Sequence, residues 1–271
     1  MFTNDNTECS TKISIISQNK FDSWLAKQQL FTKNWCLSNN FKGEKLKILK
    51  IPYPDGRLNE VIIGEGQNKD LSGVSKFASS NKGNYYISTK FALCDDLEAQ
   101  KAWSWGNYNL RSKSQKNLLY VENKKSLNFL NLYTNSLNFS RDLINLPANE
   151  INPVSFFNKV KKSHLFSNFH FHDYSLSEIK SNFPLTYAVG KSSNSQPQVI
   201  HISNKKILKK DKPLVIIGKG VTFDTGGVNI KPGNSMRNMK KDMGGSAIAI
   251  SLFLLANYLL KKTKIVLIIP L

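Results

Sequence analysis

The segment from Gly218 to Gly245 places the strongest constraint on how this chain can fold. It carries lysines, two aspartates and two Gly-Gly pairs, and an apolar run lies on either side of it. The first run, 213–217, is short, β-branched and bounded by proline and glycine, which predicts a buried strand. The second run, 247–260, has apolar residues at helical spacing, which predicts a helix. The polar segment would then lie at the carboxyl end of a strand, where open α/β sheets bind ligands.

Two aspartates in this segment are candidate ligands of a divalent metal. Asp224 and Asp242 supply hard oxygen donors on the two arms of the loop, and lysines lie near both. Carboxylates with neighbouring lysines can hold a metal ion and orient a polarised substrate. The same residues would also fit a solvated loop in which the carboxylates neutralise the lysines. A phosphate-binding loop is excluded, because Lys219 lacks the upstream glycine and the following Ser or Thr of that motif.

The segment closely resembles the metal-site signature of the leucine aminopeptidase (M17, cytosol aminopeptidase) family. The family pattern is approximately V-G-K-G-[VL]-T-F-D-[ST]-G-G-[IV]-[SN]-[IL]-K-P, followed by M-K-x-D-M-x-G-[AS]-A, and this sequence follows its spacing without insertion or deletion. The resemblance implies that Lys219, Asp224 and Asp242 are metal ligands. It also implies that Lys231 is the catalytic lysine that steadies the oxyanion, and that Met239 lines the pocket for the first side chain of the substrate.

The implied roles require opposite charge states of two lysines. Lys219 can ligate a metal only as the neutral amine, which a dry environment and a nearby dication would favour. We expect that dry environment because Lys219 lies two residues after the end of the apolar run 213–217. Lys231 would instead stay charged, because its implied role is electrostatic stabilisation of a tetrahedral intermediate.

A second stretch resembles the same family and indicates the domain organisation. Residues 140–153 read SRDLINLPANEINP, which is similar to the family pattern (A/S)-R-D-L-x-N-x-P-(A/S)-N-x-x-x-P. In the family this helix and loop link the N-terminal domain to the catalytic domain. The resemblance therefore implies an α/β protein with an N-terminal α/β domain over 1–135. The first part of a mixed-sheet α/β metallopeptidase catalytic domain would follow over 136–271.

The chain departs from the family pattern in ways that affect the implied site. It stops at Leu271, whereas family members continue to an N-T-D-A-E-G-R motif that supplies the remaining acidic ligands and a catalytic arginine. Arg237-Asn238 replaces two residues that are usually acidic, and Lys241 replaces a usual tyrosine. These replacements add positive charge beside the implied cations, which is mildly unfavourable.

The resemblance implies a leucyl-type metallo-aminopeptidase that removes N-terminal amino acids, preferably apolar ones, from peptides. In the family two divalent ions, Zn or Mn, activate water and polarise the carbonyl, whereas we expect one weakly bound ion here. Family members form hexamers, which we expect of this protein only with a complete catalytic domain. One alternative is a catalytically inactive, truncated remnant of the family. Another is a basic α/β module that binds nucleic acid.

Charge and composition bear on partners and compartment. The net charge is +19, which can indicate nucleic-acid or anionic-membrane partners. The lysines are spread along the chain, and only 205–212 forms a basic cluster, so we interpret the charge as a compositional bias and expect neither partner. The scattered Cys9, Cys36 and Cys94 are typical of free thiols in a reducing compartment. The N-terminus has no signal-peptide pattern, and 247–260 is too short to span a bilayer, which predicts a cytoplasmic protein.

The rest of the chain alternates predicted helices and strands, which indicates a layered α/β fold. Helices are expected at 21–35, 96–105 and 127–146, and strands at 46–51, 61–64, 85–89, 169–173, 185–190, 198–202 and 265–271. The aromatic segment 103–108 is interpreted as packing at a helix end rather than as a recognition surface. His170 and His172 share one strand face, where two histidines can ligate a metal, but no third ligand lies near them in the sequence.

Overall fold

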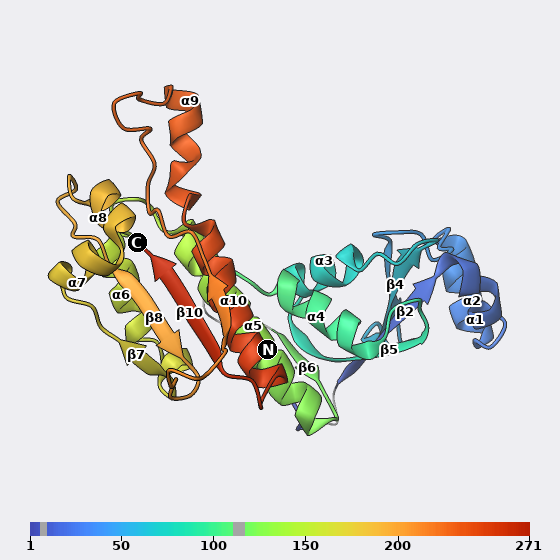
Figure 1. The fold of residues 1–271 in the computed structure, drawn as a ribbon. Helices are drawn as coiled ribbons and strands as arrows, with labels where there is room; N and C mark the ends of the chain where they lie inside the picture. The colour runs from blue at the N-terminus through green and yellow to red at the C-terminus, as the bar shows by residue number, and fades with distance from the viewer. Residues whose placement is uncertain (6–9, 111–116) are drawn as a thin grey trace. The chain divides into compact units, whose positions relative to one another are not determined.

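The computed structural model describes residues 1–5, 10–110 and 117–271, so Cys9 lies outside the described residues. The chain divides into two compact units, Met1–Thr134 and Asn135–Leu271. Each unit is built around its own β-sheet (Figure 1).

The first unit contains a six-stranded sheet in the order β1-β6-β5-β2-β4-β3. Its strands are β1 (Phe2–Thr3), β2 (Thr11–Ser17), β3 (Ile48–Pro52), β4 (Leu58–Gly66), β5 (Gly83–Phe91) and β6 (Asn117–Tyr120). Neighbouring strands are parallel except for β3 and β4, which are antiparallel. Strand β2 is therefore an interior strand, although the sequence predictions assigned no element to it.

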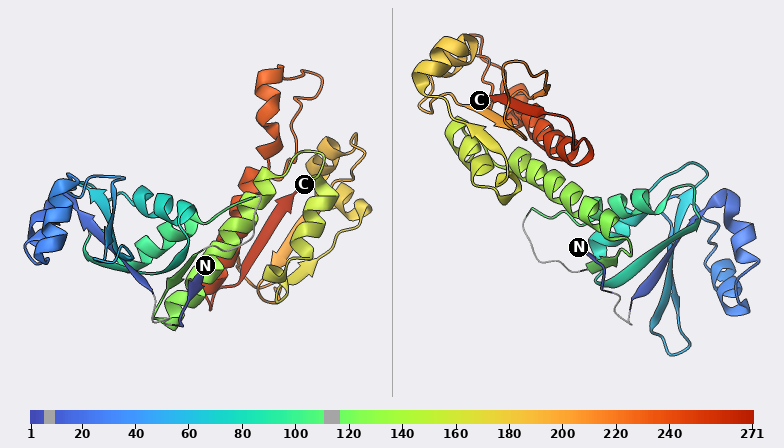
Figure 2. Two further views of the ribbon diagram at one scale, coloured as in Figure 1. Left: turned by 180° about the vertical axis from the view of Figure 1, so that it is seen from behind. Right: turned by 60° about the horizontal axis from the view of Figure 1, so that its bottom comes forward.

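Helices lie on both faces of this first sheet (Figure 2). They are η1 (Gln18–Lys20), α1 (Phe21–Leu25), α2 (Leu30–Ser38), α3 (Ser72–Ser80) and α4 (Asp96–Gly106). On one face Ile63 is buried with Phe77 and Trp103 from α3 and α4, and on the other Ile62 is buried with Trp24 from α1. The adjacent Ile62 and Ile63 serve opposite faces because side chains alternate along a strand.

The second unit contains a four-stranded sheet in the order β7-β8-β10-β9. Its strands are β7 (His170–His172), β8 (Val199–Ser203), β9 (Leu214–Ile217) and β10 (Ile265–Pro270). Strand β8 is antiparallel to β7 and to β10, and β9 is parallel to β10. Helix α5 (Lys124–Asn145) begins in the first unit and ends in the second. The other helices of the second unit are α6 (Pro153–Lys161), η2 (His164–Phe166), α7 (Leu176–Asn182), α8 (Pro184–Gly190), α9 (Gly233–Met236), η3 (Arg237–Lys241) and α10 (Gly244–Leu259).

Helix α10 is the core helix of the second unit. Its Ile250 and Phe253 are fully buried, and Ser251 on α10 is hydrogen-bonded to α5. The hydroxyl of Ser251 lies 2.6 Å from that of Ser140 and donates a 2.8 Å hydrogen bond to the carbonyl of Ser136. The hydroxyl of Ser140 also donates to the carbonyl oxygen of Ala247. These two buried hydroxyls join α5 and α10, and both of them are hydrogen-bonded.

The stretch Gly233–Leu259 is long and apolar enough, by length and composition, to cross a membrane. Its most apolar window is 44% buried inside the protein, and the core helix of a soluble protein meets the same criterion. The sequence prediction against a membrane span counted only 247–260, whereas the helical stretch begins earlier. The stretch is therefore weak evidence for a membrane span.

Three sequence predictions about elements are wrong. The helix expected at 21–35 is interrupted because Gln29 has an extended backbone, with φ −64° and ψ 156°. The strand expected at 185–190 is helix α8, since Pro184 occupies its first turn, where proline suits a helix. Strand β9 forms where it was expected, but it is an exposed edge strand rather than a buried one. The other predicted helices and strands are confirmed.

Candidate metal centre

The candidate site is the loop 218–243, which connects β9 to α10 and extends beyond the second sheet (Figure 1). Two glycines hold the start of this loop against its neighbours. A Cβ atom at Gly218 would lie 2.6 Å from the Cα of Ser246, and one at Gly220 would lie 2.3 Å from the carbonyl oxygen of Pro270. Only glycine permits such close backbone approach. The backbone of Lys219, between them, accepts a 3.0 Å hydrogen bond from the amide of Ser246.

The predicted ligands and the predicted catalytic lysine form two lysine–aspartate ion pairs. The Nζ atom of Lys219 lies 2.8 Å from Oδ1 and 2.7 Å from Oδ2 of Asp242. The Oδ2 atom of Asp242 is shielded from solvent. It accepts no hydrogen bond with suitable geometry, although the ammonium of Lys219 lies close to it. The Nζ atom of Lys231 lies 2.9 Å from Oδ2 of Asp224. Each carboxylate therefore already has one cationic partner.

The two ion pairs are electrostatically coupled through Asp224. The hydrogen bond from Lys231 is the main cause that lowers the pKa of the Asp224 carboxyl. The backbone amide of Gly226 also donates to this carboxylate at 2.8 Å, and the charge of Lys219 lowers its pKa further. Asp224 is thus an ionised oxygen donor at neutral pH, within the field of both lysines.

The dry environment expected around Lys219 is absent. Its side chain is 57% exposed, because β9 is an edge strand and Leu214 and Ile217 on it are themselves exposed. Burial therefore does not favour the neutral amine that metal ligation would require. Neutralisation of Lys219 would depend on a nearby cation alone.

The donors in the loop fit a single divalent ion in part. Asp224 and Asp242 offer carboxylate oxygens, which suit Mn and Zn, and Lys219 offers an amine. Among residues 1–5, 10–110 and 117–271, no three His, Cys, Asp or Glu side chains are placed to hold a metal together. Since protein-bound Zn takes about four ligands and harder ions take more, water, substrate or further protein groups would have to complete the coordination.

Short helical turns carry the second arm of the loop. Met239 is half-buried in η3, and its carbonyl accepts a 3.1 Å hydrogen bond from the amide of Asp242. The ammonium of Lys240 donates a 3.2 Å hydrogen bond to the carbonyl of Asn145 at the end of α5. Sequence reasoning missed this contribution of Lys240, although the residue lies inside the family motif. The contact ties the arm that carries Asp242 to the body of the second unit.

The histidines considered as an alternative metal site lie in the second sheet. His172 pairs in register with His201 on β8, and their ring centroids are 5.5 Å apart. The hydroxyl of Tyr174 lies 2.7 Å from Nδ1 of His201. Burial lowers the pKa of His201, and the charge of His172 lowers it further. This cluster is separate from the loop 218–243 in the sequence.

Both parts of the chain match known protein families. The cytosol aminopeptidase family, catalytic domain, matches residues 138–271, and the M17 aminopeptidase N-terminal domain matches residues 11–120. A probable cytosol aminopeptidase of Aquifex aeolicus is 28% identical over 239 residues, which cover 79% of this chain and 48% of that protein. The chain spans about half the length of the curated relatives it matches.

Solved structures show the same fold. The cytosol aminopeptidase of Coxiella burnetii has a TM-score of 0.82 and 24% identity, with 99% of this chain and 60% of that chain covered. The bottromycin maturation enzyme BotP in complex with Mn has a TM-score of 0.71 and 19% identity, with 97% and 59% covered. The predicted fold class is confirmed: an N-terminal α/β domain followed by part of a mixed-sheet α/β catalytic domain.

Proposed function

We propose that this chain, which belongs to the cytosol aminopeptidase (M17) family, carries part of the catalytic centre of an enzyme that removes N-terminal amino acids from peptides. The observation that carries the proposal is the coupled pair of lysine–aspartate contacts in the loop 218–243. Each of the two carboxylates already binds a lysine ammonium, and a metal cation could take the place of one of these ammonium groups. Peptides with an apolar N-terminal residue would be the preferred substrates.

In this proposal Lys219, Asp224 and Asp242 hold a divalent ion, Mn or Zn. A bound ion would polarise the scissile carbonyl and acidify the attacking water. Lys219 would give up its proton, and Asp242 would exchange its ammonium partner for the cation. The Mn in the complex of the structural neighbour BotP supports the choice of ion. Three protein donors are few, so we expect one weakly held ion in this chain, where the family has two.

Lys231 and Met239 have different proposed roles. Lys231 keeps its proton and stabilises the oxyanion of the tetrahedral intermediate. Its 2.9 Å contact with Asp224 holds the ammonium at the site before substrate arrives. Met239, which lies three residues before Asp242 on the same arm, would contact the first side chain of the peptide. The charged Arg237 and Lys241 are exposed, so their extra positive charge is partly screened by water.

The proposal extends to the organisation of the protein. We assign residues 1–135 to the N-terminal domain and 136–271 to the first part of the catalytic domain. The two compact units and the two family matches support this assignment. The names of the relatives support a cytoplasmic location. A hexamer is proposed for the assembly that contains a complete catalytic domain.

Hydrolysis of leucine p-nitroanilide tests the function. With excess Mn, residues 1–271 alone should give no measurable rate, because too few groups position the reacting water. Activity should appear when a polypeptide corresponding to the other half of the relatives is added. Lys231→Ala and Asp242→Ala should each lower the restored rate by about 10²–10³. Lys212→Ala, an exposed lysine just before β9, is the matched control and should keep it.

Three outcomes would change the proposal. Robust hydrolysis by residues 1–271 alone would show that the site is already complete. An unaffected Lys231→Ala would remove the role assigned to that lysine. If no complementing half restores activity, the alternative of an inactive remnant of the family is favoured.

Metal binding can be measured without activity. Calorimetric titration with Mn or Zn should show at most one ion per chain, bound more weakly than micromolar. Affinity should rise with pH, because ligation by Lys219 releases a proton. Asp242→Asn should weaken binding by about tenfold or more, whereas Asp55→Asn, an exposed carboxylate in the first unit, should not. Two ions bound at micromolar affinity would contradict the proposed ligand set.

A further inference from the structure

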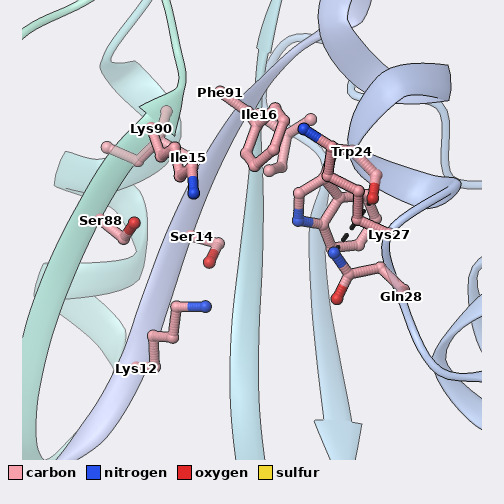
Figure 3. Close-up of a pocket in the computed structure, with 10 residues that line it drawn as sticks. All are labelled: Lys12, Ser14, Ile15, Ile16, Trp24, Lys27, Gln28, Ser88, Lys90 and Phe91. Atoms are coloured by element: carbon pink, nitrogen blue, oxygen red, sulfur yellow. Dashed lines mark hydrogen bonds between the residues drawn. The ribbon is translucent and has the colours of Figure 1, made fainter.

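A cavity of about 200 Å³ lies in the first unit, between strands β2 and β5 and the segment that contains α1 (Figure 3). Its polar lining consists of Lys12, Ser14, Lys27, Gln28, Ser88 and Lys90. All of these residues belong to Met1–Thr134, so the cavity is independent of the loop 218–243 and of the function proposed for it.

The cavity has a polar floor on interior strands of a sheet. Ser14 on β2 pairs in register with Ser88 on β5, so the two hydroxyl-bearing residues are direct neighbours. Ser14 is only 4% exposed. A polar residue is therefore buried on an interior strand, where apolar residues usually pack. Further along the same two strands, after a shift in their register, Ile16 pairs with Phe91 beside the buried Trp24. The cavity therefore has a hydroxyl-lined part and an aromatic wall.

The charges around the cavity do not cancel. Lys12 forms a 3.1 Å ion pair with Glu60, which also accepts a 2.5 Å hydrogen bond from the hydroxyl of Ser14. Among the described residues, neither Lys27 nor Lys90 forms an ion pair with a carboxylate. The ammonium of Lys27 lies 5.2 Å from the ring centroid of Phe91, at the aromatic wall. Three lysines therefore face one carboxylate, which leaves the cavity positive.

We propose that this cavity binds a small metabolite that carries an oxyanion, either a phosphate or a carboxylate. The oxyanion is held by Lys27, Lys90 and the hydroxyl of Ser88, since ammonium and hydroxyl groups donate to anionic oxygens. The apolar part of the ligand lies against Trp24 and Phe91. The cavity is smaller than the ~300–1,000 Å³ of pockets for drug-sized ligands, so the ligand is of the size of a sugar phosphate or a dipeptide.

Calorimetric titration of the full chain with two pairs of probes tests the proposal. Inorganic phosphate and ribose 5-phosphate form one arm, and acetate and a glycyl dipeptide form the other, all in a low-salt buffer without other oxyanions. We expect saturable binding of one molecule per chain in at least one arm. Lys27→Gln/Lys90→Gln should weaken it by about tenfold, equivalent to about 1.4 kcal/mol. The matched control is Lys76→Gln/Lys82→Gln, exposed lysines of the same unit, which should leave the affinity unchanged.

A second variant is expected to have the opposite effect on the affinity. Glu60→Gln should strengthen binding several-fold, because it frees Lys12 and removes the only carboxylate paired with a described residue of the cavity lining. Asp55→Asn, which removes an equal charge elsewhere in the unit, should not. Tryptophan fluorescence during thermal unfolding confirms that each variant folds.

Each result decides the proposal. Saturation by phosphate probes alone identifies a phosphate ligand, and saturation by carboxylate probes alone identifies a carboxylate ligand. Binding that does not saturate in either arm contradicts the proposal. So does equal weakening in both double-lysine variants, because that result would reflect general attraction to a protein of net charge +19.

Discussion

The same four residues, Val-Ile-Ile-Gly, occur in a strand of each unit and have opposite environments. In β4 they are residues 61–64, and in β9 and the residue after it they are residues 215–218. Ile63 is 1% exposed, whereas the corresponding Ile217 is 69% exposed. Both segments form strands, so the local sequence decides the conformation. The burial of these residues depends on what the rest of the chain places around them.

The neighbours of the two strands explain the difference. Strand β4 lies between β2 and β3, and buried clusters cover both of its faces. Strand β9 pairs only with β10 among the described strands, and Ile216 alone is buried in it. An apolar edge strand with an open face is a surface on which other chains can pair or pack. The second unit therefore presents a surface that the first unit does not.

The largest expected difference is in stability. Ile63→Ala should lower the free energy of unfolding of the first unit by about 2–5 kcal/mol, because it leaves a cavity in a packed core. Ile217→Ala makes the same chemical change at an exposed position and should cost less than about 0.5 kcal/mol. All four tryptophans lie in the first unit, so urea denaturation followed by tryptophan fluorescence measures the first effect.

Hydrogen exchange of peptides from the second unit measures the effect of Ile217→Ala, because no tryptophan reports on that unit. A loss for Ile217→Ala as large as that for Ile63→Ala would mean that β9 is covered in solution. The comparison between the two strands would then fail.

Self-association is the next effect in size. The chain should associate at micromolar concentration, because Ile217 on β9 and Leu252 on α10 are both exposed on elements that pack together. Ile217→Lys/Leu252→Lys should raise the concentration at which light scattering detects association by about tenfold, since charges on an edge oppose pairing. Leu30→Lys/Leu37→Lys on α2, also exposed, is the matched control in the first unit and should have less effect.

A clean monomer by light scattering, with a sharp thermal transition, would contradict this expectation. It would show that the exposed apolar residues of the second unit promote association no more than those of the first unit.

The smallest effect concerns an ion pair of the first unit. The pKa of Asp70 is lowered from 3.8 to about 2, mainly by a hydrogen bond from Lys45 and also by Ser72. Because the folded pKa lies below the unfolded one, Asp70 stabilises the fold above about pH 4, and this contribution is lost as the pH falls towards 2. Lys45→Met should raise the pKa of Asp70 and cost less than about 1 kcal/mol at pH 7.

Carbon-detected NMR titration of the Asp70 carboxyl measures the pKa directly. Urea denaturation at pH 7 and at pH 2 should show that the difference between Lys45→Met and the parent chain shrinks in acid. A difference that persists at pH 2 would mean that Lys45 acts through another group.

Local sequence patterns predict many of the helices and strands, but not which strands pair or how deeply each strand is buried. Helix α4 was predictable because it has acids in its first turn and a capping box at Asp95. Strand β2 was missed because its partners, near Glu60 and Tyr85, are far away in the sequence. The burial of β9 was overestimated for the same reason. Apolar composition predicts a strand, whereas its position in the sheet comes from distant pairing.

The candidate site divides in the same way. The motif identified the charged residues of the loop 218–243, and their role as a metal site stays a prediction. The motif did not indicate that Lys219 pairs with Asp242 or that Lys231 pairs with Asp224, since these contacts depend on how the loop closes. The cavity in the first unit had no local signature, because its lining comes from separate segments, 12–28 and 88–91.

The position of β10 in the second sheet has a consequence for synthesis on the ribosome. Strand β10 lies between β8 and β9, although it follows both in the chain. Until Ile265–Pro270 has emerged, β9 has no described strand to pair with, whereas the strands of the first sheet are complete at Tyr120. Domains generally fold from the N-terminus as they are made, at about 5–20 residues per second. The nascent second unit therefore remains open for several seconds after the first can close, and the apolar β9 is the segment that a chaperone would meet.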